Sequence, residues 1–73
     1  MAILSKTFTN SSNLEHAKYD ETNQKLTIGF KTGALYEYTD VPMDVWEGLI
    51  NASSAGSFFH QAIRGAFNYA RVG

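Results

Sequence analysis

A run of small polar residues, Ser53-Ser54-Ala55-Gly56-Ser57, precedes an apolar segment and is the first feature that suggests chemistry. A serine at the start of a helix accepts hydrogen bonds from N–H groups of the first turn. Such N–H groups also attract phosphate, and a glycine among them permits a ligand to approach closely. The run predicts a helix cap at Ser53 or Ser54, either alone or together with a phosphate site. In the second case Ser54, Gly56 and Ser57 contact the phosphate.

His60 and Arg64 follow, four residues apart and on a different helix face from Phe59 and Ile63. With Ser57 they form a polar stripe, which is either an ordinary solvated face or part of a ligand site. In the second case Arg64 is the best cation in the chain for a phosphate or carboxylate. It lies about 10–15 Å beyond the helix start. Only a dinucleotide-sized ligand or a partner chain would therefore reach both places.

Two more groups are candidates for ligand contact. Tyr36 and Tyr38 are either core residues whose hydroxyls reach the rim or, if exposed, a stacking surface for bases. Ser11, Ser12 and Asn13 belong to a polar loop that is either solvated or supplies groups that read a base edge.

Signatures of catalysis are missing from the sequence. His16 and His60 have no neighbouring Asp or Glu cluster of metal-site type, and no G-x-S-x-G motif occurs. The chain has no cysteine. We therefore expect a non-enzymatic module without a metal or cofactor.

Composition limits the partners. The 73 residues predict a single domain over residues 1–73, and the net charge of −1 disfavours binding to a long polyanion. A core of this size is marginal, so self-association into a homo-oligomer is an alternative to a stable monomer. No apolar run is long enough to cross a membrane, and we expect a cytoplasmic protein without membrane contact.

The spacing of apolar residues predicts three strands. Residues 25–31 alternate clearly, and residues 14–20 and 35–41 are their expected neighbours. Pairing Phe30 with Tyr36 puts both tyrosines on the apolar face, whereas a shift by one residue turns them outward. This register also sets Ile28 opposite Tyr38. It leaves a three-residue loop, Thr32-Gly33-Ala34, in which Gly33 is suited to a positive φ.

Two helices are expected after the strands. The first spans about 42–50, and the second spans about 55–67 with Phe59, Ile63, Ala66 and Phe67 as its buried stripe. The end of the chain, 68–73, either frays or adds a short edge strand. The predicted fold is a two-layer α+β domain, a three-stranded antiparallel meander followed by two helices packed on one face.

The order and spacing of several short motifs resemble the KTSC domain, a small family named for its place at the C-terminus of some lysyl-tRNA synthetases. The resemblance covers Ser11 to Val72. It is carried by Ser11-Ser12-Asn13, Tyr36-x-Tyr38 before Val41-Pro42, Ser54-x-Gly56 followed by Phe59, Ile63-Arg64, and Tyr69.

The family also occurs as single domains in bacteria and phages, and its synthetase neighbours imply RNA binding. Where family members are often more basic in the last helix, this chain has Ala66 and Asn68, which weakens that implication.

Three functions follow as hypotheses. The favoured one is a module that binds a small nucleotide-like, phosphate-bearing ligand, such as a phage-type domain that sequesters a signalling nucleotide. The alternatives are an RNA-binding accessory domain, and a protein-interaction or inhibitor module with an apolar patch around Trp46 or Phe58.

Overall fold

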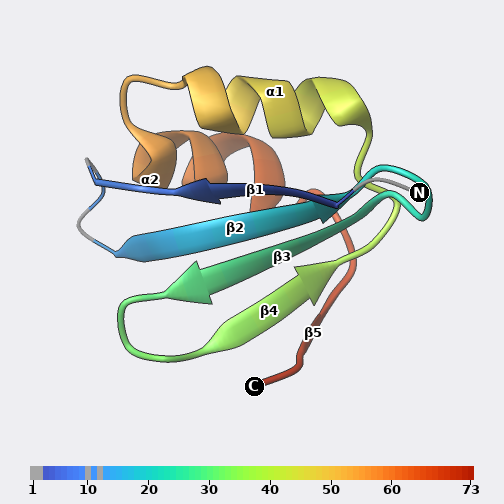
Figure 1. Cartoon of the computed structure of the whole chain (residues 1–73), viewed down its shortest axis with the longest axis horizontal. Helices are drawn as coiled ribbons and strands as arrows, with labels where there is room; N and C mark the ends of the chain where they lie inside the picture. The colour runs from blue at the N-terminus through green and yellow to red at the C-terminus, as the bar shows by residue number, and fades with distance from the viewer. Residues whose placement is uncertain (1–2, 10, 12) are drawn as a thin grey trace.

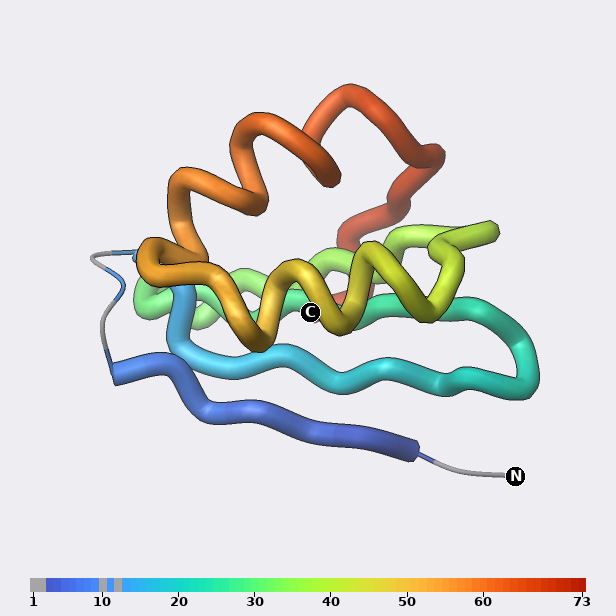
Figure 2. Tube along the Cα trace, turned by 90° about the horizontal axis from the view of Figure 1, so that it is seen from above, coloured from blue at the N-terminus to red at the C-terminus, as the bar shows by residue number. Residues whose placement is uncertain are grey.

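A computed structural model of the chain describes residues 3–9, 11 and 13–73. Five antiparallel strands form one sheet in the order β1-β2-β3-β4-β5, and the helices cover one of its faces (Figures 1 and 2). The elements are β1 Ile3–Thr7, β2 Leu14–Asp20, β3 Lys25–Phe30, β4 Leu35–Tyr38, α1 Met43–Asn51, α2 Ala55–Phe58, η1 Phe59–Ile63 and β5 Tyr69–Arg71. No helix among the described residues is long and apolar enough to span a membrane.

The predicted α+β class and the two helices on one face are confirmed, but the sheet has five strands where three were expected. β5 is the edge strand that the C-terminal residues were expected to form as one alternative. β1 was not predicted. It pairs with β2 at the other edge of the sheet and is exposed along most of its length, so its sequence lacks a clear apolar alternation.

The predicted register of the β3–β4 hairpin is wrong by two residues. Ile28 lies opposite Tyr36, not Tyr38. The three-residue loop is Lys31-Thr32-Gly33, because the N–H of Phe30 donates to the carbonyl of Ala34 at 2.9 Å. A shift of two residues keeps every side chain on its face, so the expectation that both tyrosines face the apolar side holds. Gly33 has the expected positive φ, 95°.

The second helix is shorter than expected. Its cap is as predicted, since Ser54 Oγ accepts a hydrogen bond from the N–H of Ser57. The helix then widens into the π-helical turn η1, where the N–H of Arg64 donates to the carbonyl of Phe59 at 2.8 Å, and it ends before Gly65, whose φ is 82°.

The predicted stripe of the second helix is consequently only half right. Phe59 and Ile63 are buried, but Ala66 is exposed and Phe67 is only partly buried. Both lie beyond the helix end, so helical periodicity no longer directs them to the core.

The core lies between the sheet and the helices. Tyr19 stacks on Trp46 there, with ring centroids 5.7 Å apart and planes 11° apart. Trp46 is only 2% exposed, so the suggested interaction patch around Trp46 is wrong. The buried hydrophobic residues are Phe8, Leu14, Ala17, Tyr19, Leu26, Ile28, Tyr38, Val41, Trp46, Leu49, Ala55, Phe59 and Ile63.

Tyr19 ties the sheet to the segment before α1. Its hydroxyl donates to the Val41 carbonyl at 2.6 Å, and burial raises the pKa of Tyr19. We expect Tyr19→Phe to lower the free energy of unfolding by about 1–3 kcal/mol, because a buried carbonyl loses its partner while the stacking on Trp46 remains. Urea unfolding followed by Trp46 fluorescence measures this. A change below about 0.5 kcal/mol, the size typical of neutral surface changes, would contradict this role.

Asp20 organises the β2–β3 turn. Its carboxylate accepts hydrogen bonds from the side-chain amide of Asn23 at 2.9 Å and from the backbone N–H groups of Thr22 and Asn23. The side-chain hydrogen bond from Asn23 is the largest cause that lowers the pKa of Asp20.

Because the folded pKa lies below the unfolded value of about 3.9, the charged form stabilises the fold above that pH and loses its effect as the pH falls through the folded pKa. We expect wild type to be more stable than Asp20→Asn at neutral pH, with the difference vanishing in acid. Urea midpoints of both proteins, measured from neutral pH down to below the folded pKa of Asp20, test this prediction. A stability difference between the two proteins that does not change with pH would refute it.

Candidate functional site

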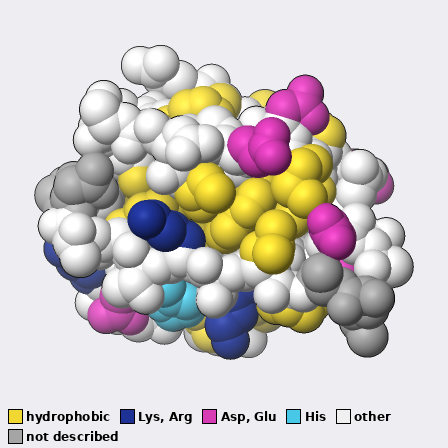
Figure 3. All heavy atoms as spheres, turned by 45° about the horizontal axis from the view of Figure 1, so that its top comes forward, with side chains coloured by type: hydrophobic (Ala, Val, Ile, Leu, Met, Phe, Trp, Pro, Cys, Tyr) yellow, Lys and Arg dark blue, Asp and Glu magenta, His cyan; other side chains and the backbone are white. Residues whose placement is uncertain are grey.

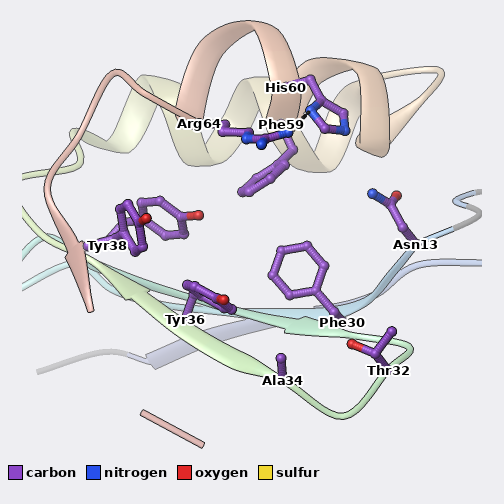
Figure 4. A pocket seen from close by; sticks show the side chains of 10 residues that line it. Asn13, Phe30, Thr32, Ala34, Tyr36, Tyr38, Phe59, His60 and Arg64 are labelled. Carbon is purple, nitrogen blue, oxygen red and sulfur yellow. Dashed lines mark hydrogen bonds between the residues drawn. The ribbon is translucent and has the colours of Figure 1, made fainter. Parts of the chain in front are cut away.

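A cavity of about 360 Å³ lies between η1 and the sheet edge formed by β4 and β5 (Figure 4). Its size falls in the lower part of the range for small-molecule sites. Its lining residues are Asn13, Phe30, Thr32, Ala34, Tyr36, Tyr38, Phe59, His60, Arg64 and Tyr69. A second, smaller cavity of about 140 Å³ lies where α1 faces β1.

Five aromatic rings in the lining form a closed cycle of contacts. Phe30 contacts Tyr36 and Phe59, with ring centroids 5.6 and 5.5 Å apart. Tyr69 contacts Tyr36 and Tyr38 at 5.6 and 5.5 Å, and Tyr38 closes the cycle by meeting Phe59 at 5.8 Å. Each ring is thus held by two others. The cavity therefore has a largely prearranged aromatic lining, in which Phe30, Tyr36 and Tyr69 keep accessible surface on which a flat ring system can stack. Tyr38 and Phe59 are buried behind them.

Two basic side chains border the same cavity: His60 lies in η1, and Arg64 directly follows η1. Arg64 Nη1 lies 3.3 Å from His60 Nδ1, and both side chains are otherwise exposed. The expected proximity of the two residues is confirmed. No Asp or Glu is among the residues that line the cavity. Its charge therefore favours an anionic ligand.

The two ends of the cavity differ in chemistry. Asn13 belongs to the hairpin end, since its carbonyl accepts a hydrogen bond from the N–H of Lys31 at 2.9 Å, and Thr32 lines the same end. Tyr38 belongs to the other end. Its pKa is raised by burial first and by Tyr69 and Tyr36 next, whereas the charge of Arg64 lowers it. The Arg64 guanidinium itself lies beside the His60 ring, on the helix side of the cavity (Figure 4).

Half of the ten predicted site residues line this cavity: Asn13, Tyr36, Tyr38, His60 and Arg64. The other five lining residues were not predicted as site residues from the sequence: Phe30, Thr32, Ala34, Phe59 and Tyr69. Ser12 is outside the described residues. The remaining four, Ser11, Ser54, Gly56 and Ser57, do not line the cavity.

These four residues have local contacts within the protein. Ser54 caps the helix by accepting from Ser57, as described above. Gly56 faces the polar loop, and a Cβ at this position would lie 2.9 Å from Asn13 Oδ1. Ser11 is only 6% exposed and accepts a hydrogen bond from the N–H of Leu14. The close approach that Gly56 permits is thus made by the protein itself.

The surface on the helix side of the molecule is partly apolar. Figure 3 shows hydrophobic side chains gathered in the middle of this face, with acidic and basic side chains beside them. Phe58, the second centre suggested for an interaction patch, is partly buried against the core. The aromatic cavity remains the strongest candidate site.

The sequence matches a known family over most of its length. The family model of the KTSC domain matches residues 10–67. The chain belongs to the KTSC domain family. A crystal structure of a KTSC domain protein from Yersinia pestis has a similar fold, with a TM-score of 0.88 and 32% identity over 99% of this chain and 100% of that one.

Curated relatives of this KTSC domain include much longer proteins. It is 43% identical over 59 residues, 81% of its length, to a lysine–tRNA ligase of Trichormus variabilis, and 46% identical over 55 residues to one of Nostoc. The KTSC domain spans about 10% of the length of these ligases. It is also 41% identical to a protein of Stutzerimonas stutzeri, over 74% of this chain and 76% of that protein.

Proposed function

We propose that this KTSC domain binds a small nucleotide-like, phosphate-bearing ligand in the aromatic cavity and thereby sequesters it. The observation that carries the proposal is the closed cycle of five rings with Arg64 at its border and no carboxylate in the lining. Base-on-aromatic stacking is worth about 1–3 kcal/mol per base and requires only a flat π-face. An arginine near such a surface complements a phosphate.

The polarity of the cavity suggests how such a ligand lies. Arg64 and His60 border the cavity on its η1 side, and Asn13 lies at the hairpin end. Ala34, just before β4, and Tyr38, at the end of β4, both line the cavity and lie four residues apart, about 13 Å in an extended strand. We therefore infer a single nucleotide aligned with β4, its phosphate near Arg64 and its base near Asn13. A ligand in this position does not extend to the helix start at Ser54, so the dinucleotide-sized ligand expected from the sequence is not required.

Binding fits the lining better than catalysis. Among the described residues that line the cavity there is no Asp, Glu, Ser, Cys or Lys, which are common nucleophiles and general bases beside histidine. The one histidine, His60, has its Nδ1 next to Arg64. We infer sequestration without turnover.

Native mass spectrometry after incubation with a pooled nucleotide extract tests this function. We expect a retained mass of one nucleotide per binding site, and the same spectrum reports whether the protein is a homo-oligomer. Arg64→Ala should lose the retained mass. Lys18→Ala should keep it, because Lys18 is exposed between the buried Ala17 and Tyr19 and so faces the other side of the sheet. An unliganded wild-type spectrum would count against the proposal.

The lysine–tRNA ligases among its relatives favour RNA binding as a second candidate. Phosphate contacts would make that binding fall steeply with salt. Fluorescence anisotropy with a single-stranded RNA at 50 and 200 mM salt separates RNA binding from nucleotide sequestration. A drop of about tenfold or more in RNA affinity, with no mononucleotide binding, would favour RNA, whereas mononucleotide binding with a small salt effect favours sequestration.

A further inference from the structure

We propose that Asn13 makes the cavity selective for bases that present a carbonyl oxygen rather than an exocyclic amine at the hairpin end. This inference rests on the proposed function and adds the chemical class of the base. It depends on which side of the Asn13 amide faces the cavity, and the hydrogen bonds of Ser11 decide that.

The hydroxyl of Ser11 has one proton to donate. Its oxygen accepts from the N–H of Leu14 at 3.0 Å and from the N–H of Asn13 at 3.3 Å. A hydroxyl has two acceptor lone pairs and one donor, so these two bonds use its acceptor capacity. The remaining contact of Ser11 Oγ, with the Asn13 side chain at 3.1 Å, must therefore be a donated hydrogen bond. The partner atom is the amide oxygen, Oδ1.

This assignment leaves the Asn13 amide nitrogen for the cavity. Nδ2 has no hydrogen-bond partner among the described residues, and the side chain points its nitrogen toward the cavity (Figure 4). The NH₂ group only donates hydrogen bonds. An oxo base offers it an acceptor, whereas an amino base would set donor against donor.

The Asn13 amide is also held in place. Its oxygen faces Gly56, where a Cβ would lie only 2.9 Å away, and its backbone carbonyl is tied to the hairpin through Lys31 N–H. Thr32 lines the same end, but a hydroxyl can donate or accept and does not discriminate. The selectivity is therefore assigned to Asn13, and a fixed donor rejects a mismatched base more strongly than a mobile one.

Isothermal titration with two matched pairs tests the inference. Inosine and adenosine monophosphate differ at one exocyclic position, oxygen against amine, as do uridine and cytidine monophosphate. Wild type should bind the oxo member of at least one pair roughly fivefold more tightly, the size of one net hydrogen bond. Arg64→Ala should weaken all four nucleotides without changing the ratio within a pair.

The informative variant is Asn13→Asp. It keeps the oxygen that accepts from Ser11 and replaces the NH₂ by an oxygen, so the preference should reverse toward the amino bases while overall affinity falls because of the added negative charge. Asn13→Ala should reduce the ratio to within about twofold.

The failures of the two proposals look different. Wild type that binds all four nucleotides equally, or a preference that survives in both Asn13 variants, would overturn the role of Asn13 and leave nucleotide binding intact. A wild type that binds none of the four at millimolar concentration would overturn both.

Discussion

Replacing Arg64 with alanine should lower the affinity for a nucleoside monophosphate about 10- to 100-fold, the range expected when a charged hydrogen bond worth about 1.5–3 kcal/mol is lost. The free energy of unfolding should change by less than about 0.5 kcal/mol, because the Arg64 side chain is exposed. Its contact with His60 is a weak surface one, 3.3 Å long. Isothermal titration and urea unfolding of the same preparations measure both quantities.

Two matched variants make this result specific. Lys18→Ala removes one positive charge on the opposite face of the sheet and should leave affinity within about twofold of wild type, since exposed charges are well screened at physiological salt. Arg64→Lys keeps the charge but loses the planar fork, so it should fall between wild type and alanine. Equal losses in Lys18→Ala and Arg64→Ala would mean that net charge, not the cavity, attracts the ligand.

Replacing Phe59 with alanine should destabilise the domain by about 3–5 kcal/mol, enough to unfold much of a chain this small at 25 °C. Phe59 is 3% exposed and its ring contacts Phe30 from β3 and Tyr38 from β4, so it joins η1 to the sheet. The same ring is part of the cavity wall. Chemical denaturation followed by Trp46 fluorescence measures the loss.

Phe59→Leu is the matched control, because leucine refills much of the space without the ring. It should cost less than about half as much as Phe59→Ala and fold fully. Its nucleotide affinity should nevertheless fall, because one of the five rings in the cycle is gone. A Phe59→Ala protein of nearly wild-type stability would contradict the placement of η1 against the sheet.

The β3–β4 hairpin shows what an alternating sequence can predict. Alternation identifies which residues face the core, and Ile28, Tyr36 and Tyr38 were assigned correctly. Alternation has a period of two, however, so it cannot distinguish registers that differ by two residues. The turn geometry decides between them, through the bond from Phe30 N–H to the Ala34 carbonyl.

Elements without strong periodicity were harder to predict. β1 is exposed along most of its length and depends on pairing with β2. The second helix was extended to residue 67 because Ala66 and Phe67 continue its apolar spacing. The bond from Arg64 N–H to the Phe59 carbonyl and the positive φ of Gly65 end it earlier. The π-helical bond has no clear signal in the sequence, whereas Gly65 is of the residue type that commonly ends a helix, and the apolar spacing was followed past it.

Half of the residues that line the candidate site could be predicted from the sequence, and the limit is again the lack of a local pattern for the others. Arg64 and His60 are four apart on one local element, so their proximity follows from helical spacing. Phe30, Phe59 and Tyr69 reach the cavity from β3, η1 and β5, and only the tertiary packing brings them together. For the serine-rich run, the structure confirms the predicted helix cap at Ser54, and the phosphate alternative stays a prediction. A helix cap and a phosphate cradle use the same residue types, so the sequence does not distinguish them.

The measurement that tests the central claim most directly is a ¹H–¹⁵N correlation spectrum of the protein titrated with uridine or inosine monophosphate. Nucleotide binding in the aromatic cavity predicts saturable shifts at Asn13, Thr32, Tyr36, His60, Arg64 and Tyr69, including the Arg64 side-chain N–H. The amides of Lys18 and Thr27, a paired couple whose side chains lie on the opposite face of the sheet, should not move. Shifts centred on that face, or no saturable shifts with either nucleotide, would contradict the claim.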